Sequence, residues 1–339
     1  MIQQLVFHIG DFKTGTTALQ DWLGAQGAQH GLGVPEIDAN ALARSLGTPA
    51  ETDSAFRALA RAVERMRTPV CVVSSEHFEH AKPALLAAAI DAHLPRHAEE
   101  MRVVAYVRPH GSALLARYGE SVKIGNFTGD LAAYLEWAPT RWRLNTHPRF
   151  LRWHAAFQNR FALRLYDRTG FAGGSVVRDF AQLLGARDPG EAGGSANPSL
   201  GLRDLALLRA LHRAIGPLPE GTAAQAAQWA LGRDLGERLA QASGLPEADQ
   251  RLVIGRTLAQ RLVKLCAQDA AATDADFFDR PVLGDSLAAV LAQAPDNPQV
   301  PDPLDCLTPD AQAAMTLWGH SLRDGLARDA DALHRLTGV

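Results

Sequence analysis

The sequence predicts an α/β fold with three layers, in which a central parallel sheet is flanked by helices, and a helical C-terminal part. Over the first half of the chain, short apolar runs alternate with segments of helical periodicity. Strands separated by helices imply crossover connections and therefore parallel pairing. The second half is rich in alanine, leucine and arginine and has helical periodicity without a clear strand. We expect a core at residues 1–185 and a helical region at 186–339 packed on it.

Each expected element has a local signal in the sequence. Four short apolar runs predict strands at 5–9, 70–73, 102–107 and 161–166. Apolar residues at helical spacing predict helices at 16–23, 55–66, 83–94, 112–121 and 173–184. The last of these helices closes at Gly185, a residue type favoured after helix C-termini. A loop rich in Gly, Pro, Asp and Ser follows at 186–197, and further helices are expected at 205–215, 223–239 and 311–336.

Composition excludes several classes of protein. The chain has 339 residues, of which 47% are hydrophobic and 21% charged, enough material for a globular core. A net charge of −3 argues against nucleic acid or an anionic membrane surface as the main partner. Cys71, Cys266 and Cys306 are too widely spaced for a disulfide framework or a metal cluster. With no leader pattern and no long apolar run, we expect a cytoplasmic protein without an integral membrane segment.

The most informative segment is residues 8–17, His-Ile-Gly-Asp-Phe-Lys-Thr-Gly-Thr-Thr, between the first strand and the first helix. A glycine-rich turn that opens a helix offers backbone N–H groups and the positive end of the helix dipole to an anion. Gly10 and Gly15 have the spacing of a Walker A loop, but Thr16 stands where that motif requires lysine. The loop's lysine is Lys13, inside the turn. The segment therefore predicts a phosphate loop that does not serve an ordinary Mg-ATP site.

Ligands of parallel sheets bind at the carboxyl ends of the strands, so the residues after the other strands are candidates too. Glu76 and His77 follow the second strand, and either side chain is suited to take a proton from a hydroxyl. Glu76 to His80 also looks metal-like, but His77 and His80 have the spacing of neither zinc-protease motif, and no third ligand is near. We expect no metal site.

Residues 13–17 resemble the 5′-phosphosulfate loop of sulfotransferases that use 3′-phosphoadenosine 5′-phosphosulfate (PAPS). Phe12 stands where this family usually has proline, and residues 8–10 are similar to those of bacterial members. Arg108 and Tyr118 match the family's 3′-phosphate motif, but its serine is Ala116 here. Residues 161–185 resemble the family's strand ending in tyrosine and the helix that follows it. The resemblance covers residues 5–185 and implies a P-loop-like fold.

The resemblance also implies roles for individual residues, with PAPS as the sulfuryl donor and no metal required. The residues expected to bind it are Lys13, Thr14, Gly15, Thr16, Thr17, Arg108, Ser112 and Tyr166. Lys13 would contact the bridging oxygen of the leaving phosphate. Arg108 would hold the 3′-phosphate, Ser112 or Arg117 would stand in for the missing serine, and Tyr166 would contact the adenine. Glu76 is the preferred base, with His77 as the alternative.

The acceptor is less well defined. The run Ser74-Ser75-Glu76 resembles the glycan enzymes of the family, which favours direct in-line transfer to a hydroxyl or amine of a carbohydrate. A lipid, a peptide or another small molecule stays open, and the helical region at 186–339 is expected on the acceptor side. Two other functions are considered: a P-loop kinase or nucleotide hydrolase, and a non-catalytic nucleotide-binding module with the helical region as a partner platform.

Overall fold

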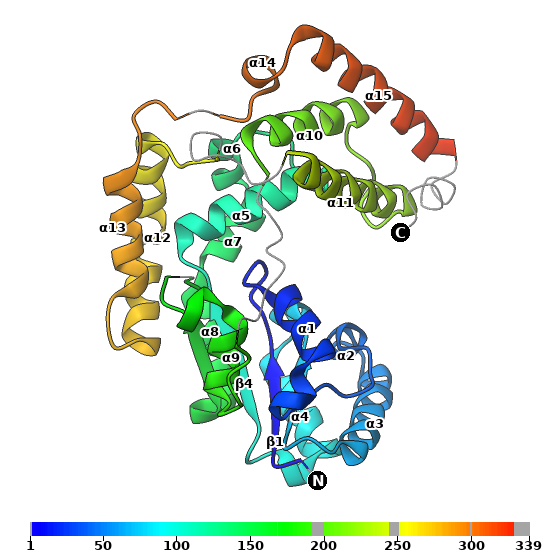
Figure 1. Cartoon of the computed structure of the whole chain (residues 1–339), viewed down its shortest axis with the longest axis vertical. Helices are drawn as coiled ribbons and strands as arrows, with labels where there is room; N and C mark the ends of the chain where they lie inside the picture. The colour runs from blue at the N-terminus through cyan, green and yellow to red at the C-terminus, as the bar shows by residue number, and fades with distance from the viewer. Residues whose placement is uncertain (1, 168, 191–199, 244–250, 299, 329–339) are drawn as a thin grey trace. The chain divides into compact units, whose positions relative to one another are not determined.

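The computed structural model describes residues 2–167, 169–190, 200–243, 251–298 and 300–328. Its centre is a five-stranded sheet in the order β2-β3-β1-β4-β5, and every neighbouring pair is parallel (Figure 1). The strands are β1 (Gln4–His8), β2 (Leu32–Gly33), β3 (Val70–Ser74), β4 (Arg102–Val107) and β5 (Phe161–Leu165). This sheet, flanked by helices, confirms the predicted α/β fold class.

Helices connect the strands and continue beyond them. Those up to the last strand are α1 (Thr16–Ala25), α2 (Ala39–Ser45), α3 (Pro49–Arg65), α4 (Pro83–His93), α5 (His110–Lys123), α6 (Leu131–Glu136), α7 (Ala138–Leu144) and α8 (Thr146–Phe157). The later ones are α9 (Val176–Leu183), α10 (Leu202–Ile215), α11 (Ala223–Ser243), α12 (Arg256–Phe277), α13 (Val282–Gln293), α14 (Pro303–Cys306) and α15 (Pro309–Arg328). A 3-10 turn, η2 (Glu76–His80), follows β3.

Some local predictions were wrong. The strand β2 has only two residues and leaves no periodic signal. The helix expected at 173–184 starts at Val176, because Gly173 and Gly174 have positive φ values and end a separate turn. The helix expected at 311–336 is α15, and residues 329–336 lie outside the described part. Residues 191–197 of the expected loop also lie outside it.

One face of the sheet packs against α1 and α9. Alternation along the strands places Val6, Val72 and Val104 on this face. They form a buried cluster with residues of both helices, among them Leu19 of α1 and Phe180 of α9. Burial of apolar surface of this kind is the main favourable contribution to folding. It fixes α1, and with it the turn that precedes α1, against the sheet.

The opposite face packs against α8 and the turn η2. Register places Phe7 beside Val103, and Val103 beside Phe161, so their side chains share this face. Phe161 stacks on Phe150 of α8 with ring centroids 6.3 Å apart, and Phe7 meets Phe78 of η2 edge-on at 5.6 Å. The helix α8 also packs against α4. The helices therefore form the two outer layers of the predicted three-layer core.

The chain folds into two units, each formed from segments that are separated along the sequence. The first comprises Met1–Pro109, Asn145–Ala196 and Asp269–Leu283, and the second comprises His110–Leu144, Asn197–Gln268 and Gly284–Val339. The first unit holds the whole sheet. In the second, α10 packs against α5, α11, α14 and α15. A single domain boundary is expected from the sequence after residue 185, and this stays a prediction. In the structure each of the two units is made of three segments that alternate along the chain.

His8 is a buried polar side chain at the carboxyl end of β1. Its exposed fraction is 1%, and its Nδ1 lies 2.9 Å from the Ser74 hydroxyl. The ring packs edge-on against those of Tyr106 and Phe180. Burial lowers the pKa of His8 from 6.5 to about 4, because a charged imidazolium loses its hydration there. At neutral pH His8 is therefore an uncharged part of the core.

This burial predicts a pH-dependent stability. Between the two pKa values the unfolded chain binds a proton that folded His8 does not, so stability falls as pH falls from 6.5 towards 4. From pH 7 to pH 5 the His8 contribution to the loss in free energy of unfolding is about 2 kcal/mol. Urea unfolding of wild type and His8→Gln at both pH values measures it. An equal loss in both proteins would contradict the prediction.

Candidate functional site

The loop after β1 is anchored to β4 through the backbone. The Ile9 N–H donates to the Val104 carbonyl at 2.9 Å, and Tyr106 N–H donates to the Gly10 carbonyl at 2.8 Å. Gly10 has φ +89°, and a Cβ placed there would lie 3.3 Å from Cα of Glu76. Glycine at this position thus lets the phosphate loop and the turn η2 approach each other closely.

The middle of the loop is held by its own side chains. The Thr14 hydroxyl is fully buried and donates to the Asp11 carbonyl at 2.5 Å. Lys13 is half-buried and has φ +65°, a left-handed conformation that is uncommon for a residue with a side chain. The Thr14 hydroxyl thus stabilises the loop, and the expected contact of Thr14 with the cofactor stays a prediction.

The N-terminus of α1 is suited to an anion. No described side chain caps this helix, and its first turn carries no acidic residue. Thr16 is 4% exposed, and its hydroxyl oxygen has no hydrogen-bond partner among the described residues. A buried hydroxyl without a partner is costly unless a ligand or water completes it. With the N–H groups of the first turn, it fits a phosphate group or a similar anion.

Arg108, after β4, and Tyr166, after β5, both contact the loop that follows β1. The Arg108 Nη1 donates to the Lys13 carbonyl at 3.0 Å, and its guanidinium carbon lies 5.5 Å from the centroid of the Tyr166 ring. A Cβ on Gly15, whose φ is +80°, would lie 3.1 Å from that ring. The structure therefore brings together the loop, the strand-end arginine and the tyrosine, although they are far apart in sequence.

The turn η2 brings Glu76 and His77 to the other side of the loop. The His77 backbone N–H donates to the Ser75 hydroxyl at 3.1 Å, and the His77 ring packs edge-on against Phe12 of the loop at 6.3 Å. Partial burial and the positive charge of Arg44 lower the pKa of His77 below its ordinary value of 6.5, and Asp38 opposes the shift. A neutral His77 is able to accept a proton at pH 7.

Two sequence predictions remain outside this cluster. Ser112 lies in α5, which belongs to the second unit, and its expected contact with a 3′-phosphate stays a prediction. Tyr118 lies in the same helix, as does Ala116, the position at which the family's serine is missing. Within the described residues, no group of three or more His, Cys, Asp or Glu side chains is arranged to hold a metal ion.

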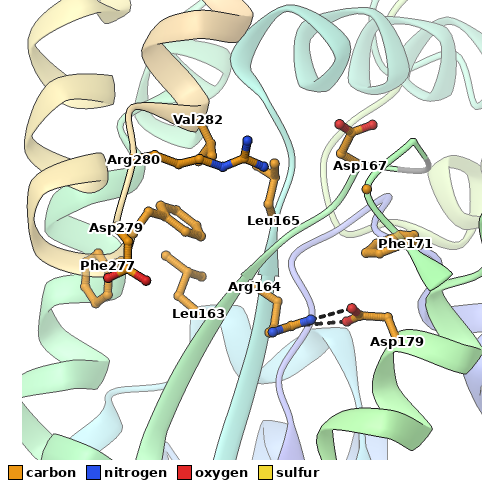
Figure 2. A pocket seen from close by; sticks show the side chains of 12 residues that line it. Leu163, Arg164, Leu165, Asp167, Phe171, Asp179, Phe277, Asp279, Arg280 and Val282 are labelled. Carbon is orange, nitrogen blue, oxygen red and sulfur yellow. Dashed lines mark hydrogen bonds and ion pairs between the residues drawn. The ribbon is translucent and has the colours of Figure 1, made fainter.

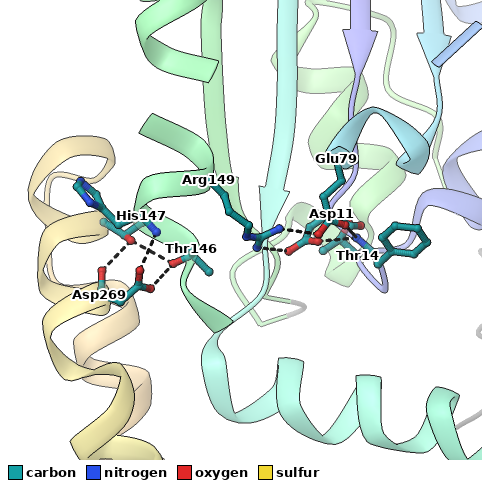
Figure 3. Close-up of polar contacts among 9 residues, drawn as sticks. Asp11, Thr14, Glu79, Thr146, His147, Arg149 and Asp269 are labelled. Carbon is teal, nitrogen blue, oxygen red and sulfur yellow. Dashed lines mark hydrogen bonds and ion pairs between the residues drawn. The ribbon is translucent and has the colours of Figure 1, made fainter. Parts of the chain in front are cut away.

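The sequence analysis missed the acidic and basic groups under the loop. Asp11, Glu79 and Arg149 are all buried, and Arg149 forms ion pairs with both carboxylates (Figure 3). Burial disfavours the charged guanidinium, but the two carboxylates more than offset it and hold the pKa of Arg149 above its ordinary value. An acidic residue in a predicted anion loop was the one available signal, since Arg149 lies 138 residues from Asp11.

A pocket of about 520 Å³ lies at the outer edge of β5 (Figure 2). Leu163 and Leu165 line it together with Phe277, Arg280 and other residues of 277–282. None of the predicted site residues lines it. Because β1 and β4 separate β3 from β5, strand spacing puts the pocket roughly 14 Å from the end of β3 and from Glu76. Leu165 and Asp167 of the pocket flank Tyr166, and Phe171 of the pocket meets the Tyr166 ring edge-on at 5.5 Å, so the pocket adjoins the Tyr166 side of the candidate site.

Comparisons with known proteins give a structural likeness. No protein-family model and no curated protein matches the chain. Among solved structures, it is similar to a sulfotransferase from Alicyclobacillus acidocaldarius, with 16% identity and a TM-score of 0.46. The similarity covers 84% of this chain and 98% of the other. No described helix is long and apolar enough to cross a membrane.

The loop geometry predicts opposite effects for two glycines. Gly15→Ala should weaken binding of 3′-phosphoadenosine 5′-phosphate (PAP), because the new methyl group would lie 2.9 Å from Val176 and 3.1 Å from Tyr166 at a left-handed residue. The control is Gly24→Ala in α1, the helix that follows Gly15, where a Cβ meets nothing within 4 Å. It should keep binding and gain about 0.5–1 kcal/mol of stability. Calorimetric titration and urea unfolding test both variants, and equal PAP affinities would contradict the prediction.

Proposed function

We propose that this protein is a PAPS-dependent sulfotransferase. One observation carries the proposal: a phosphate loop with its lysine, Lys13, inside the turn is packed between Tyr166 and Arg108 on one side and Glu76 on the other. In Walker A loops the lysine reaches the β- and γ-phosphates of ATP, and the Ser/Thr hydroxyl after it binds magnesium. The position of Lys13 and the buried hydroxyl of Thr16 favour a different anion.

The residues divide the work of holding PAPS. The N–H groups at the start of α1 and the Thr16 and Thr17 hydroxyls would bind the 5′-phosphate. Arg108 would pair with the 3′-phosphate, and the Tyr166 ring would contact the adenine. These groups supply the positive charge and hydrogen-bond donors that a polyanion requires. When bound, PAPS supplies the sulfuryl group and is converted to PAP.

The remaining groups act on the transfer step. Glu76 removes the proton from the acceptor hydroxyl, or from an amine, as the acceptor oxygen or nitrogen bonds to sulfur. The bond between sulfur and the bridging oxygen breaks, and its electron pair stays on the phosphate. Lys13 offsets the charge that develops there, an interaction that is stronger in the transition state than before it. His77 is the alternative base, and its lowered pKa is compatible with that role.

The acceptor is proposed to be a carbohydrate. The support is the similarity of Ser74-Ser75-Glu76 to glycan-acting members of the family, and a glutamate rather than a histidine as the preferred base. A bacterial-type enzyme and a cytoplasmic location belong to the same proposal.

Calorimetric titration with PAP in EDTA, set against ADP with magnesium, tests the cofactor. We expect PAP to bind without metal and more tightly than ADP. Lys13→Ala should weaken PAP binding by about 1.5–3 kcal/mol, the usual range for a hydrogen bond to a charged group. The control is Lys82→Ala, which removes an exposed lysine before α4. Preference for ADP with magnesium would favour the kinase instead.

Measuring turnover as well as PAP binding distinguishes the residue that acts as the base from the residues that bind PAPS. Glu76→Gln should bind PAP like the wild type yet release PAP from PAPS at least about 100-fold more slowly, the usual contribution of a general base. Far-UV circular dichroism checks that the variant is folded. Unchanged turnover in this variant would remove Glu76 from the mechanism. PAP binding without turnover on any acceptor would indicate a non-catalytic module.

A further inference from the structure

A buried ion-pair cluster connects the phosphate loop to the turn that carries Glu76. Arg149 of α8 donates from Nη2 to Asp11 at 3.0 Å and from Nη1 to Glu79 at 2.6 Å (Figure 3). Each of these three side chains is 5% exposed. Asp11 lies two residues before Lys13, and Glu79 lies three residues after Glu76. One guanidinium is thus bonded to both segments.

Arg149 comes from a helix whose own position is fixed. At the N-terminus of α8, Asp269 accepts hydrogen bonds from the Thr146 hydroxyl at 2.5 Å and from the His147 N–H at 2.8 Å. One turn later Phe150 stacks on Phe161 of β5. The guanidinium is planar, so its two ends hold the carboxylates at a set separation. Figure 3 shows Arg149 reaching from α8 between Asp11 and Glu79.

The net charge of this cluster indicates that Arg149 has a role beyond neutralising the carboxylates of Asp11 and Glu79. Two carboxylates and one guanidinium have a formal charge of −1, and one of the carboxylates, Asp11, belongs to the loop that is proposed to bind a polyanion. An apolar pair of similar volume would be at least as stable in many proteins and would not repel the ligand. The arrangement is therefore best explained by the geometry that it imposes on the two segments.

We infer that Arg149 is a positioning residue, which sets the spacing between the phosphate loop and the turn η2. The inference rests on the proposed function, in which Lys13 and Glu76 act on opposite sides of the transferred group. Both ends of the guanidinium are needed, so a lysine would keep the charge but lose the connection. Ligand binding in the loop should then stabilise η2 less when Arg149 is replaced, because the guanidinium bridge is lost while the direct contacts of Phe12 with Glu79 and His77 remain.

Hydrogen–deuterium exchange with PAP as the probe tests this coupling. At a PAP concentration of about ten times its Kd, wild-type exchange should slow up to about ten-fold in residues 10–17 and also in 76–80. In Arg149→Lys it should slow in residues 10–17 but change less than about two-fold in 76–80. The control is Arg164→Lys, which alters the Arg164–Asp179 ion pair of the same unit. It should behave like the wild type.

A second variant tests the same coupling in case Arg149→Lys does not fold. Glu79→Ala removes the hydrogen-bond acceptor of Arg149 on the side of the turn and should reduce the effect of PAP on residues 76–80 in the same way. Slowed exchange in both segments of either folded variant, equal to the wild type, would overturn the inference. If PAP slows exchange in neither segment of the wild-type protein, the proposed function fails instead. The two failures are thus distinguishable.

Discussion

Parallel pairing of β1 with both β3 and β4 is the constraint on which the candidate site depends. Parallel strands must end at the same edge, so the segments that follow them meet there. The loop after β1 continues its hydrogen bonding to β4 as far as Asp11, and Gly10 packs against Glu76 after β3. A phosphate loop, a strand-end arginine and a candidate base are brought together without any local sequence contact between them.

The site combines an electropositive surface with a buried negative cluster. Backbone N–H groups of α1, Lys13 and Arg108 are suited to a polyanion. Beneath them, Asp11 and Glu79 share Arg149. Such a cluster is acceptable when its groups are fully paired and shielded from water, since the cost of an unpaired buried charge is then avoided. Its benefit for an enzyme would be geometric, because groups held at fixed separation lose less entropy when they act together.

Local patterns predicted most of the strands of the core and the glycine-rich turn after β1. Four of the five strands and the helix α1 were predicted within a residue or two from apolar runs and periodicity. Gly10 and Gly15 were recognisable as a phosphate turn, and both have positive φ values in the structure. The strand β2 was missed because two residues carry no periodicity. The position of Ser112 in a different unit was equally invisible to a motif.

The sequence by itself determined the fold class, the glycine-rich turn after β1 and the order of the candidate segments, since these depend on neighbouring residues and on periods of two and 3.6. Only the tertiary structure decided which groups meet. It paired Arg149 with Asp11 and Glu79, placed the Tyr166 ring against Gly15, and made His8 a neutral core residue. The physical reason is that long-range pairing and burial are properties of the packed chain, and no short stretch of sequence records them.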